Sequence, residues 1–318
     1  DMDALPIQEE TGAEYASQNP GVMHACGHDG HTAVGLTAAR LLHAHRHELH
    51  GSVKLVFQPA EEGLGGAARM IHEGILDNPR PEAALALHVW NDKPLGWIGV
   101  TPGPVMAAAE TFKIVVTGKG GHGAAPHLAV DPVLAASQIV VALQSIVSRN
   151  VPPLETAVVT VAAIHGGQAF NVIPPMVEMK GTIRSFNTEV RARVLERFDQ
   201  IVQGTAQAFG CQAQIENSFL TPAVVNDPRI TSRVQSLVGK VLPEASLDTN
   251  ERTMGSEDMA YILQGVPGCF IFIGSSNAEK HLDAPHHHPR FDFDERALPR
   301  AAALIAAAAA DYLAAPTS

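Results

Sequence analysis

The chain has few cysteines, no disulfide pattern and a shortage of positive charge. Only three of its 318 residues are cysteines: Cys26, Cys211 and Cys269. Their odd number and wide spacing exclude a disulfide framework and favour a reducing, cytoplasmic compartment. A formal net charge of −11 argues against nucleic acid or an anionic membrane as the main partner. No apolar run is expected to span a bilayer, because the alanine-rich stretch at 301–310 is typical of an amphipathic helix.

The segment His24–His31 concentrates the side chains that bind metals. It holds three histidines and Cys26 within HACGHDGH. Neutral imidazole and thiolate are preferred ligands of zinc and similar divalent ions. Cys26 and His28 are two residues apart, and Gly27 between them permits the tight backbone geometry that would aim both at one centre. A metal site is therefore the first hypothesis.

Further candidate ligands occur where predicted strands end. Glu61 and Glu62 follow a predicted buried strand at 51–58 and precede a glycine turn. One such carboxylate can ligate a metal while its neighbour holds a water as general base, although a bare pair is more often a solvated turn. His88 ends an apolar strand, and a histidine triplet precedes Pro289. Each of these histidines alone is weak evidence for a ligand.

The hydrophobic pattern predicts two domains of mixed α/β architecture. Strands at 51–58 and 83–88 alternate with helices at 32–50 and 63–77, which is typical of a layered α/β domain with a largely parallel sheet and active groups at the strand ends. A β-α-β-β-α-β order then matches a ferredoxin-like α+β unit, with elements at 110–117, 131–149, 156–164, 177–185, 188–209 and 211–219. The last elements are expected at 228–241, 256–264, 268–273 and 295–314. We therefore expect a domain at 107–219 inserted into a discontinuous catalytic domain at 1–106 and 220–318.

Taken together, the motifs resemble the metallopeptidase/amidohydrolase family M20. The similarity is to its aminoacylase-like branch of hippurate hydrolases, IAA-amino acid hydrolases and N-acetyl-diaminopimelate deacetylases. The matching motifs run nearly the whole chain: DMDALP (1–6), MHACGHDGH (23–31), FQPAEEG (57–63), ALHVW (86–90), GKGGHGAAPH (118–127), GGQAFNVIP (166–174), GTIRSF (181–186), MGSEDMAY (254–261) and HHHPRFDFDE (286–295). Motifs in this number and order are specific, whereas any one alone is not. The resemblance implies a metal-dependent exopeptidase-like catalytic domain with an inserted dimerisation (lid) domain.

The resemblance also implies a centre of two divalent ions, zinc or else manganese, cobalt or nickel. The implied ligands are Cys26, His28, Glu62, His88 and His287. His287 stands two residues before the proline, as in the family pattern, while His286 and His288 remain possible. Glu61 matches the general base, and Asp3 matches an acidic residue that orients a ligand. Asp1 falls where other branches carry a ligand histidine, and a metal role for it is not expected.

Three residues of the inserted domain have roles implied by the resemblance. His122 matches a residue that stabilises the oxyanion, reaching the site of a partner subunit. Asn171 and Arg184 match residues that bind the free carboxylate of the substrate. From the residues alone, His122 could equally be a turn histidine and Arg184 a surface ion pair. His24 and His31 are expected to be structural supports of the metal segment.

The implied activity is hydrolysis of N-acyl-L-amino acids, hippurate-like or acetylated, to a carboxylate and an amino acid. We expect a homodimer or homotetramer that acts on a small molecule, with no nucleic-acid or membrane partner. The alternatives are an M20 dipeptidase or carboxypeptidase, and a non-catalytic metal-dependent binding protein on the same fold. Family members carry a strand–helix–strand segment before DMDALP, so we expect the 318-residue chain alone to fold poorly or to be weakly active.

Overall fold

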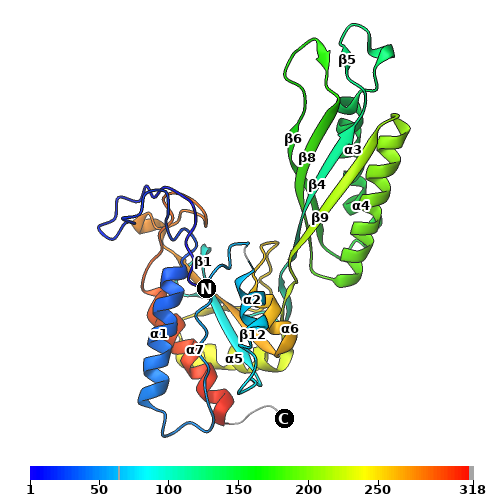
Figure 1. The fold of residues 1–318 in the computed structure, drawn as a ribbon. Coiled ribbons are helices and arrows are strands. Elements are labelled where there is room, and N and C mark those ends of the chain that lie inside the picture. The colour runs from blue at the N-terminus through cyan, green and yellow to red at the C-terminus, as the bar shows by residue number, and fades with distance from the viewer. Residues whose placement is uncertain (64, 315–318) are drawn as a thin grey trace. The chain divides into compact units, whose positions relative to one another are not determined.

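The computed structural model describes residues 1–63 and 65–314, which divide into two compact units (Figure 1). Unit 1 comprises Asp1–Val105, Val224–Thr253 and the chain from Glu257 onward. Unit 2 comprises Met106–Ala223 together with the short segment Met254–Ser256. The inserted unit is thus slightly longer than the predicted 107–219, and it includes a returning segment that the sequence pattern did not assign to it.

Unit 1 is built on a mixed four-stranded sheet in the order β1-β12-β2-β11. Its strands are β1 (Ala84–Pro94), β12 (Gly268–Ser276), β2 (Trp97–Gly99) and β11 (Ser246–Asp248). β1 runs parallel to β12, β2 is antiparallel to β12, and β11 is parallel to β2. β12 reads GCFIFIG and is buried along its length, as expected of a strand covered on both faces. His88 pairs with Phe272 of β12 and lies within β1, which continues to Pro94 instead of ending at His88 as the sequence pattern suggested.

Helices complete the core of unit 1. They are α1 (His28–Ala44), α2 (Gly66–His72), α5 (Pro228–Val241), α6 (Met259–Gly265) and α7 (Ala297–Ala314), and a two-stranded pair joins β3 (Gly103–Met106) to β10 (Val224–Asn226). Val34 of α1, Val234 of α5 and Leu304 of α7 pack with Ile271 of β12 in one apolar cluster. Asp227 fixes the start of α5, since its carboxylate accepts the backbone N–H groups of the first turn.

Unit 2 has the element order of a ferredoxin-like fold. In chain order the elements are β4 (Ala108–Thr117), α3 (Pro132–Ser145), β6 (Ala157–His165), β8 (Met176–Ser185), α4 (Thr188–Ala208) and β9 (Gln212–Thr221). The strands form an antiparallel sheet in the order β6-β8-β4-β9. Phe112 of β4 and Phe198 of α4 meet beneath it, with ring centroids 4.7 Å apart. A separate short pair, β5 (Gly121–His122) with β7 (Val172–Ile173), stands beyond the sheet (Figure 1).

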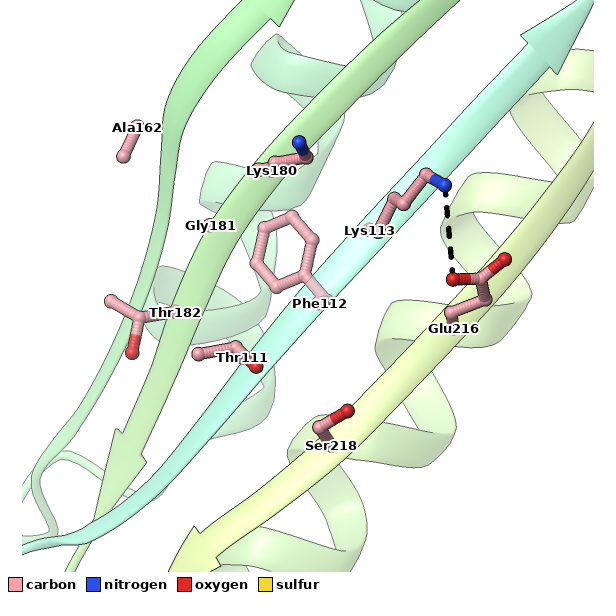
Figure 2. Close-up of a pocket in the computed structure, with 9 residues that line it drawn as sticks. All are labelled: Thr111, Phe112, Lys113, Ala162, Lys180, Gly181, Thr182, Glu216 and Ser218. Atoms are coloured by element: carbon pink, nitrogen blue, oxygen red, sulfur yellow. Dashed lines mark ion pairs between the residues drawn. The ribbon is translucent and has the colours of Figure 1, made fainter. Parts of the chain in front are cut away.

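The sheet of unit 2 has one apolar face and one charged face. Phe112 points to the helices, and the next residue, Lys113, therefore points to the opposite side. There Lys113 Nζ lies 3.9 Å from Glu216 Oε2, and Lys180 Nζ lies 3.0 Å from Glu178 Oε1. Figure 2 shows residues that line a hollow here, among them Lys113, Lys180 and Glu216. Lys113 and Glu216 join β4 to β9, and cross-strand pairs of opposite charge stabilise a solvated sheet face, whereas Lys180 and Glu178 are neighbours along β8.

The predicted strand at 51–58 is wrong. Within the described residues this segment pairs with no strand, and Val53, Leu55 and Val56 are 40%, 43% and 37% exposed. An apolar, β-branched run gives a strand only when a neighbour pairs its N–H and C=O groups, and the sequence pattern does not report that neighbour. Other boundaries moved by a few residues: α1 begins at His28 instead of residue 32, and α2 is confined to Gly66–His72.

Two helices are more apolar than the sequence pattern suggested. Pro132–Asn150 and Ala297–Ala314 are each long and apolar enough to cross a bilayer, with mean hydropathy 1.3. The buried side chains of each helix, however, pack into the core of its own unit, as Ile139 and Leu304 do. A core helix of a globular protein meets the same length and hydropathy criteria, so these helices carry no argument for a membrane protein.

Candidate metal centre

Gly27 brings Cys26 and His28 together at the start of α1. It has φ +86°, the left-handed region that suits glycine, and it is the N-cap of the helix. A Cβ atom at this position would lie 2.4 Å from Val89 Cγ2, so the close approach to β1 also requires glycine. The chain therefore turns sharply between the two candidate ligands, and it leaves His28 in the first turn of α1, 1% exposed.

A second tight turn presents Glu61 and Glu62. Ala60 has φ +61°, a conformation uncommon for a residue with a Cβ atom. The Gly66 N–H donates to Ala60 O across the turn at 3.1 Å, and a Cβ at Gly66 would lie 1.7 Å from Pro59 O. Only glycine fits this closure, which places the two carboxylates immediately before α2.

Asp258 holds this turn from the other side. Its carboxylate accepts hydrogen bonds from the Gln58 side-chain amide and from the Ala67 N–H, the latter at 2.9 Å. The Asp258 N–H in turn donates to Glu61 Oε1 at 3.4 Å. Gln58 and Asp258 were not among the predicted site residues, although both lie in the quoted motifs. The sequence does not show that Gln58 and Asp258 form a hydrogen bond, because the two residues come together only in the folded chain.

The candidate ligands converge with unused lone pairs. Cys26, Glu62 and His287 have ligand atoms within 4.8 Å of one another, and so do His28, Glu61 and Glu62. Cys26 Sγ also lies 3.5 Å from His88 Nε2, so the sulfur faces both groups. Within the described residues, both ring nitrogens of His28 and Oε1 of Glu62 are buried and form no hydrogen bond of good geometry, although His28 Nδ1 lies 3.3 Å from Asp3 Oδ1 and Glu62 Oε1 lies 3.1 Å from His287 Nε2. Buried polar atoms left unpaired in this way call for an ion or water.

The Nε2 atom of His88 faces Cys26 and is free to accept a metal ion. The Nδ1–H of the same ring donates to the carbonyl oxygen of Val89 at 2.5 Å, which leaves the lone pair on Nε2 facing Cys26. Fixing one nitrogen by a backbone carbonyl is a common way to orient a metal-binding histidine. Burial lowers the pKa of His88 well below its ordinary value and that of His28 to about 4, so both rings are neutral, as a ligand must be.

Hydrogen bonds separate the three members of the histidine triplet. His286 Nε2 accepts the Asn91 N–H at 3.1 Å, and His288 Nδ1 accepts the Arg290 N–H at 3.0 Å. The remaining nitrogen of each neutral ring must then carry the proton, so neither ring offers a lone pair to a metal. His287 has φ +64°, which turns its Nε2 to within 3.1 Å of Glu62 Oε1. This geometry supports His287, the residue that the sequence favoured.

Asp3 and His31 contact residues next to or within the set of candidate ligands. Asp3 Oδ2 accepts the Glu62 N–H at 2.9 Å, and its Oδ1 lies 3.3 Å from His28 Nδ1. Burial opposes ionisation of Asp3, but hydrogen bonds from the backbone at Glu62 and Glu61 lower its pKa overall. His31 Nδ1 lies 2.6 Å from Asp1 Oδ1, while its Nε2 accepts the Val89 N–H. With both nitrogens engaged, His31 is a structural residue, and Asp1 serves as its partner.

Glu61 lies among other carboxylates. Burial first, and then the charges of Glu62, Asp258 and Asp3, raise its pKa above the ordinary range. Glu257 is 4% exposed and shares a cluster with Glu61 and Asp258. Such a carboxylate is a stronger proton acceptor than an exposed one, as a general base near neutral pH requires. The sequence predicted Glu61 but gave no sign that Glu257 would accompany it.

The remaining predicted residues belong to unit 2. His122 and Asn171 are neighbours at the β5–β7 pair, where the Gly123 N–H donates to Asn171 O at 2.8 Å. His122 Nδ1 accepts the Ala124 N–H, so its proton is on Nε2 and available for donation. Arg184 donates to Ser256 Oγ at 2.8 Å and, within the described residues, forms no ion pair. That argues against its interpretation as a surface ion pair.

The site combines a thiol, neutral imidazoles and carboxylates around a carboxylate that can act as a base. This set of groups is typical of a metal-dependent hydrolase. The chain belongs to peptidase family M20/M25/M40, whose model matches residues 1–311. It is 44% identical over 301 residues to the N-acetyl-L-cysteine deacetylase of Bacillus subtilis, covering 95% of this chain and 70% of that protein. It is 42% identical over 317 residues to IAA-amino acid hydrolase ILR1-like 4 of Arabidopsis thaliana, and the match covers 98% of this chain and 72% of that protein.

A solved structure agrees with this assignment. The Bacillus subtilis YXEP protein, described as a dinuclear metal binding peptidase of the M20 family, superposes with a TM-score of 0.82 at 36% identity. The match covers 98% of this chain and 79% of that one. The predicted family, the mixed α/β fold class and the assignment as a metal-dependent amidohydrolase are thereby confirmed.

Proposed function

We propose that the protein hydrolyses N-acyl-L-amino acids to a carboxylic acid and a free amino acid. The observation that carries the proposal is the convergence of candidate ligand atoms: those of Cys26, Glu62 and His287 lie within 4.8 Å of one another, and Cys26 Sγ lies 3.5 Å from His88 Nε2. The named activities of the two curated relatives, on N-acetylcysteine and on an IAA-amino acid, point to amides whose amine side is an amino acid.

The donor set fits two divalent ions. Cys26, His28, Glu62, His88 and His287 would together hold them, since the ligand atoms of Cys26, Glu62 and His287 lie within 4.8 Å of one another and Cys26 Sγ lies 3.5 Å from His88 Nε2. Thiolate and imidazole donors favour zinc, while manganese, cobalt and nickel suit the same mixed set. When bound, the ions supply Lewis-acid polarisation of the scissile carbonyl. Elemental analysis of protein purified without added metal identifies the native ions.

Glu61 is proposed as the proton carrier. Its raised pKa suits it to take a proton from the attacking water and to deliver that proton to the leaving amine. Asp3 keeps Glu62 and His28 in place through its two oxygens. The roles of His122 in oxyanion stabilisation and of Asn171 and Arg184 in carboxylate binding stay predictions. They are supported by the available Nε2–H of His122 and by a guanidinium that has no ion pair among the described residues.

The assembly is proposed to be a cytoplasmic homodimer or homotetramer. Phe170 and Val172, on either side of Asn171, are fully and 53% exposed, and adjacent exposed apolar side chains are typical of a surface that packs against another molecule. Light scattering of the purified protein measures the oligomeric state directly, and a monomer at working concentration would contradict the proposal.

A substrate panel tests the function. Hippurate, N-acetylcysteine, N-acetylmethionine and an indole-acetyl amino acid are compared with simple dipeptides, with and without a chelator. Chelator-sensitive release of the amino acid from the acylated substrates supports the proposal. Faster cleavage of the dipeptides would favour a dipeptidase or carboxypeptidase, and binding without turnover would favour a non-catalytic binding protein.

A further inference from the structure

His286 lies against Cys26 but has a proton where a ligand would have a lone pair. Its Nε2 accepts the Asn91 N–H at 3.1 Å, so that nitrogen is unprotonated. The proton of the ring is therefore on Nδ1, and Nδ1 lies 3.7 Å from Cys26 Sγ. Because sulfur is larger than oxygen, this separation suits an N–H···S hydrogen bond.

The surroundings of His286 fix its ring plane. Its centroid lies 5.2 Å from that of Trp90, 5.0 Å from that of Phe291 and 5.3 Å from that of His88. These rings surround the imidazole, so the direction of its N–H is set by packing.

The backbone donor is fixed as well. Asn91 is 3% exposed, and its side-chain amide donates to the carbonyl oxygens of Ala284 and Asp292. Its side-chain oxygen accepts the Ser275 hydroxyl at 3.0 Å. The Asn91 N–H therefore cannot turn away from His286, and the tautomer of His286 is built into the fold.

We propose that His286 is a positioning residue that donates an N–H···S hydrogen bond to the Cys26 thiolate and holds the sulfur at the metal centre. The inference rests on the proposed function, since Cys26 is a thiolate only as a ligand. Adjacent histidines then have different tasks. His287, turned by its positive φ, faces Glu62, whereas His286 faces the sulfur. Groups that hold a ligand in this way change metal affinity about 10-fold to 100-fold when removed.

Cobalt(II) alone is the probe, because a thiolate bound to it gives a near-ultraviolet charge-transfer band. Four variants are compared with the wild type: His286→Leu, His286→Asn, His286→Gln and Cys26→Ser. The leucine removes the donor and keeps the apolar bulk. An asparagine amide can stand where Nδ1 stands, whereas a glutamine amide reaches the position of Nε2. Melting curves of the metal-free proteins confirm that each variant is folded.

We expect His286→Leu to move the band to longer wavelength and to weaken cobalt binding by about 10-fold to 100-fold, because loss of the hydrogen bond raises the energy of the sulfur electrons. His286→Asn should restore both properties toward wild type, and His286→Gln should not. An unchanged band and affinity in His286→Leu overturns the role of His286 and leaves the proposed function intact. If cobalt-loaded wild-type protein shows no charge-transfer band that disappears in Cys26→Ser, both the role of His286 and the proposed metal centre are overturned.

Discussion

Replacing Glu61 by glutamine removes the proposed base and little else. Glutamine has nearly the same shape, and its side-chain oxygen can still accept the Asp258 N–H that meets Glu61 Oε1 at 3.4 Å. Positioned general bases contribute about 10²-fold to 10⁴-fold, and the buried setting of Glu61 places it toward the upper end. We therefore expect kcat to fall by about 10³-fold or more, equivalent to ~4 kcal/mol of transition-state stabilisation.

The same variant should keep its metal and its stability. Burial first, and then the charges of Glu62, Asp258 and Asp3, raise the pKa of Glu61 to about 8, so its side chain is mostly uncharged at pH 7 in the metal-free protein; an uncharged glutamine changes little there, and Tm should not fall. Steady-state hydrolysis of an N-acetyl amino acid, elemental analysis and a melting curve measure the three quantities. Glu73→Gln is the control, since Glu73 is exposed and pairs with Arg69. A Glu61→Gln enzyme within tenfold of wild-type kcat and with full metal content would refute the assignment of the base.

Three further predictions follow from charges and lone pairs. Arg184→Gln should raise KM by about tenfold to 100-fold for an acylated amino acid but not for its amide, which lacks the carboxylate, and comparing the two substrates tests this. His287→Ala should lower the bound metal per chain, whereas His288→Ala should not, as elemental analysis would show. Asp294 has its pKa held low by Arg296, so its stabilising effect is complete above about pH 4 and is lost as the pH falls further. Asp294→Asn should therefore lower the urea midpoint at pH 7, and the difference in midpoint between the variant and the wild type should be smaller at pH 3.

The sequence predicted those helices and strands whose defining features lie within a single segment. The helix at 228–241 was placed at its observed bounds, because its apolar period and the Asp227-Pro228 start are local features. β12 was found because a continuous apolar run between breakers is distinctive. The segment at 51–58 shows the same kind of sequence but lacks a neighbour among the described residues, and pairing is a tertiary property. Short strands such as β2 and β11 carry too few residues to show a period.

The site was predictable where backbone geometry dictates residue type. Gly27 between Cys26 and His28 is required by its left-handed φ and by the closeness of Val89, and a glycine between two candidate ligands is visible in the sequence. Glu257 and Asp258 were missed as neighbours of Glu61, since nothing local relates positions nearly two hundred residues apart. Buried carboxylates that share an environment become apparent only when the chain is folded.

The histidine triplet shows why the ligand set could not be completed from spacing. The three side chains are chemically identical, and they differ only in the hydrogen-bond partners of their ring nitrogens. The backbone N–H of Asn91, nearly two hundred residues earlier, occupies one nitrogen of His286, and the N–H of Arg290 occupies one nitrogen of His288. A neutral imidazole whose nitrogen accepts an N–H must hold its proton on the other, so it can donate but cannot ligate. The capacity of a histidine to bind metal is thus set by its hydrogen-bond partner, which for His286 comes from a distant strand.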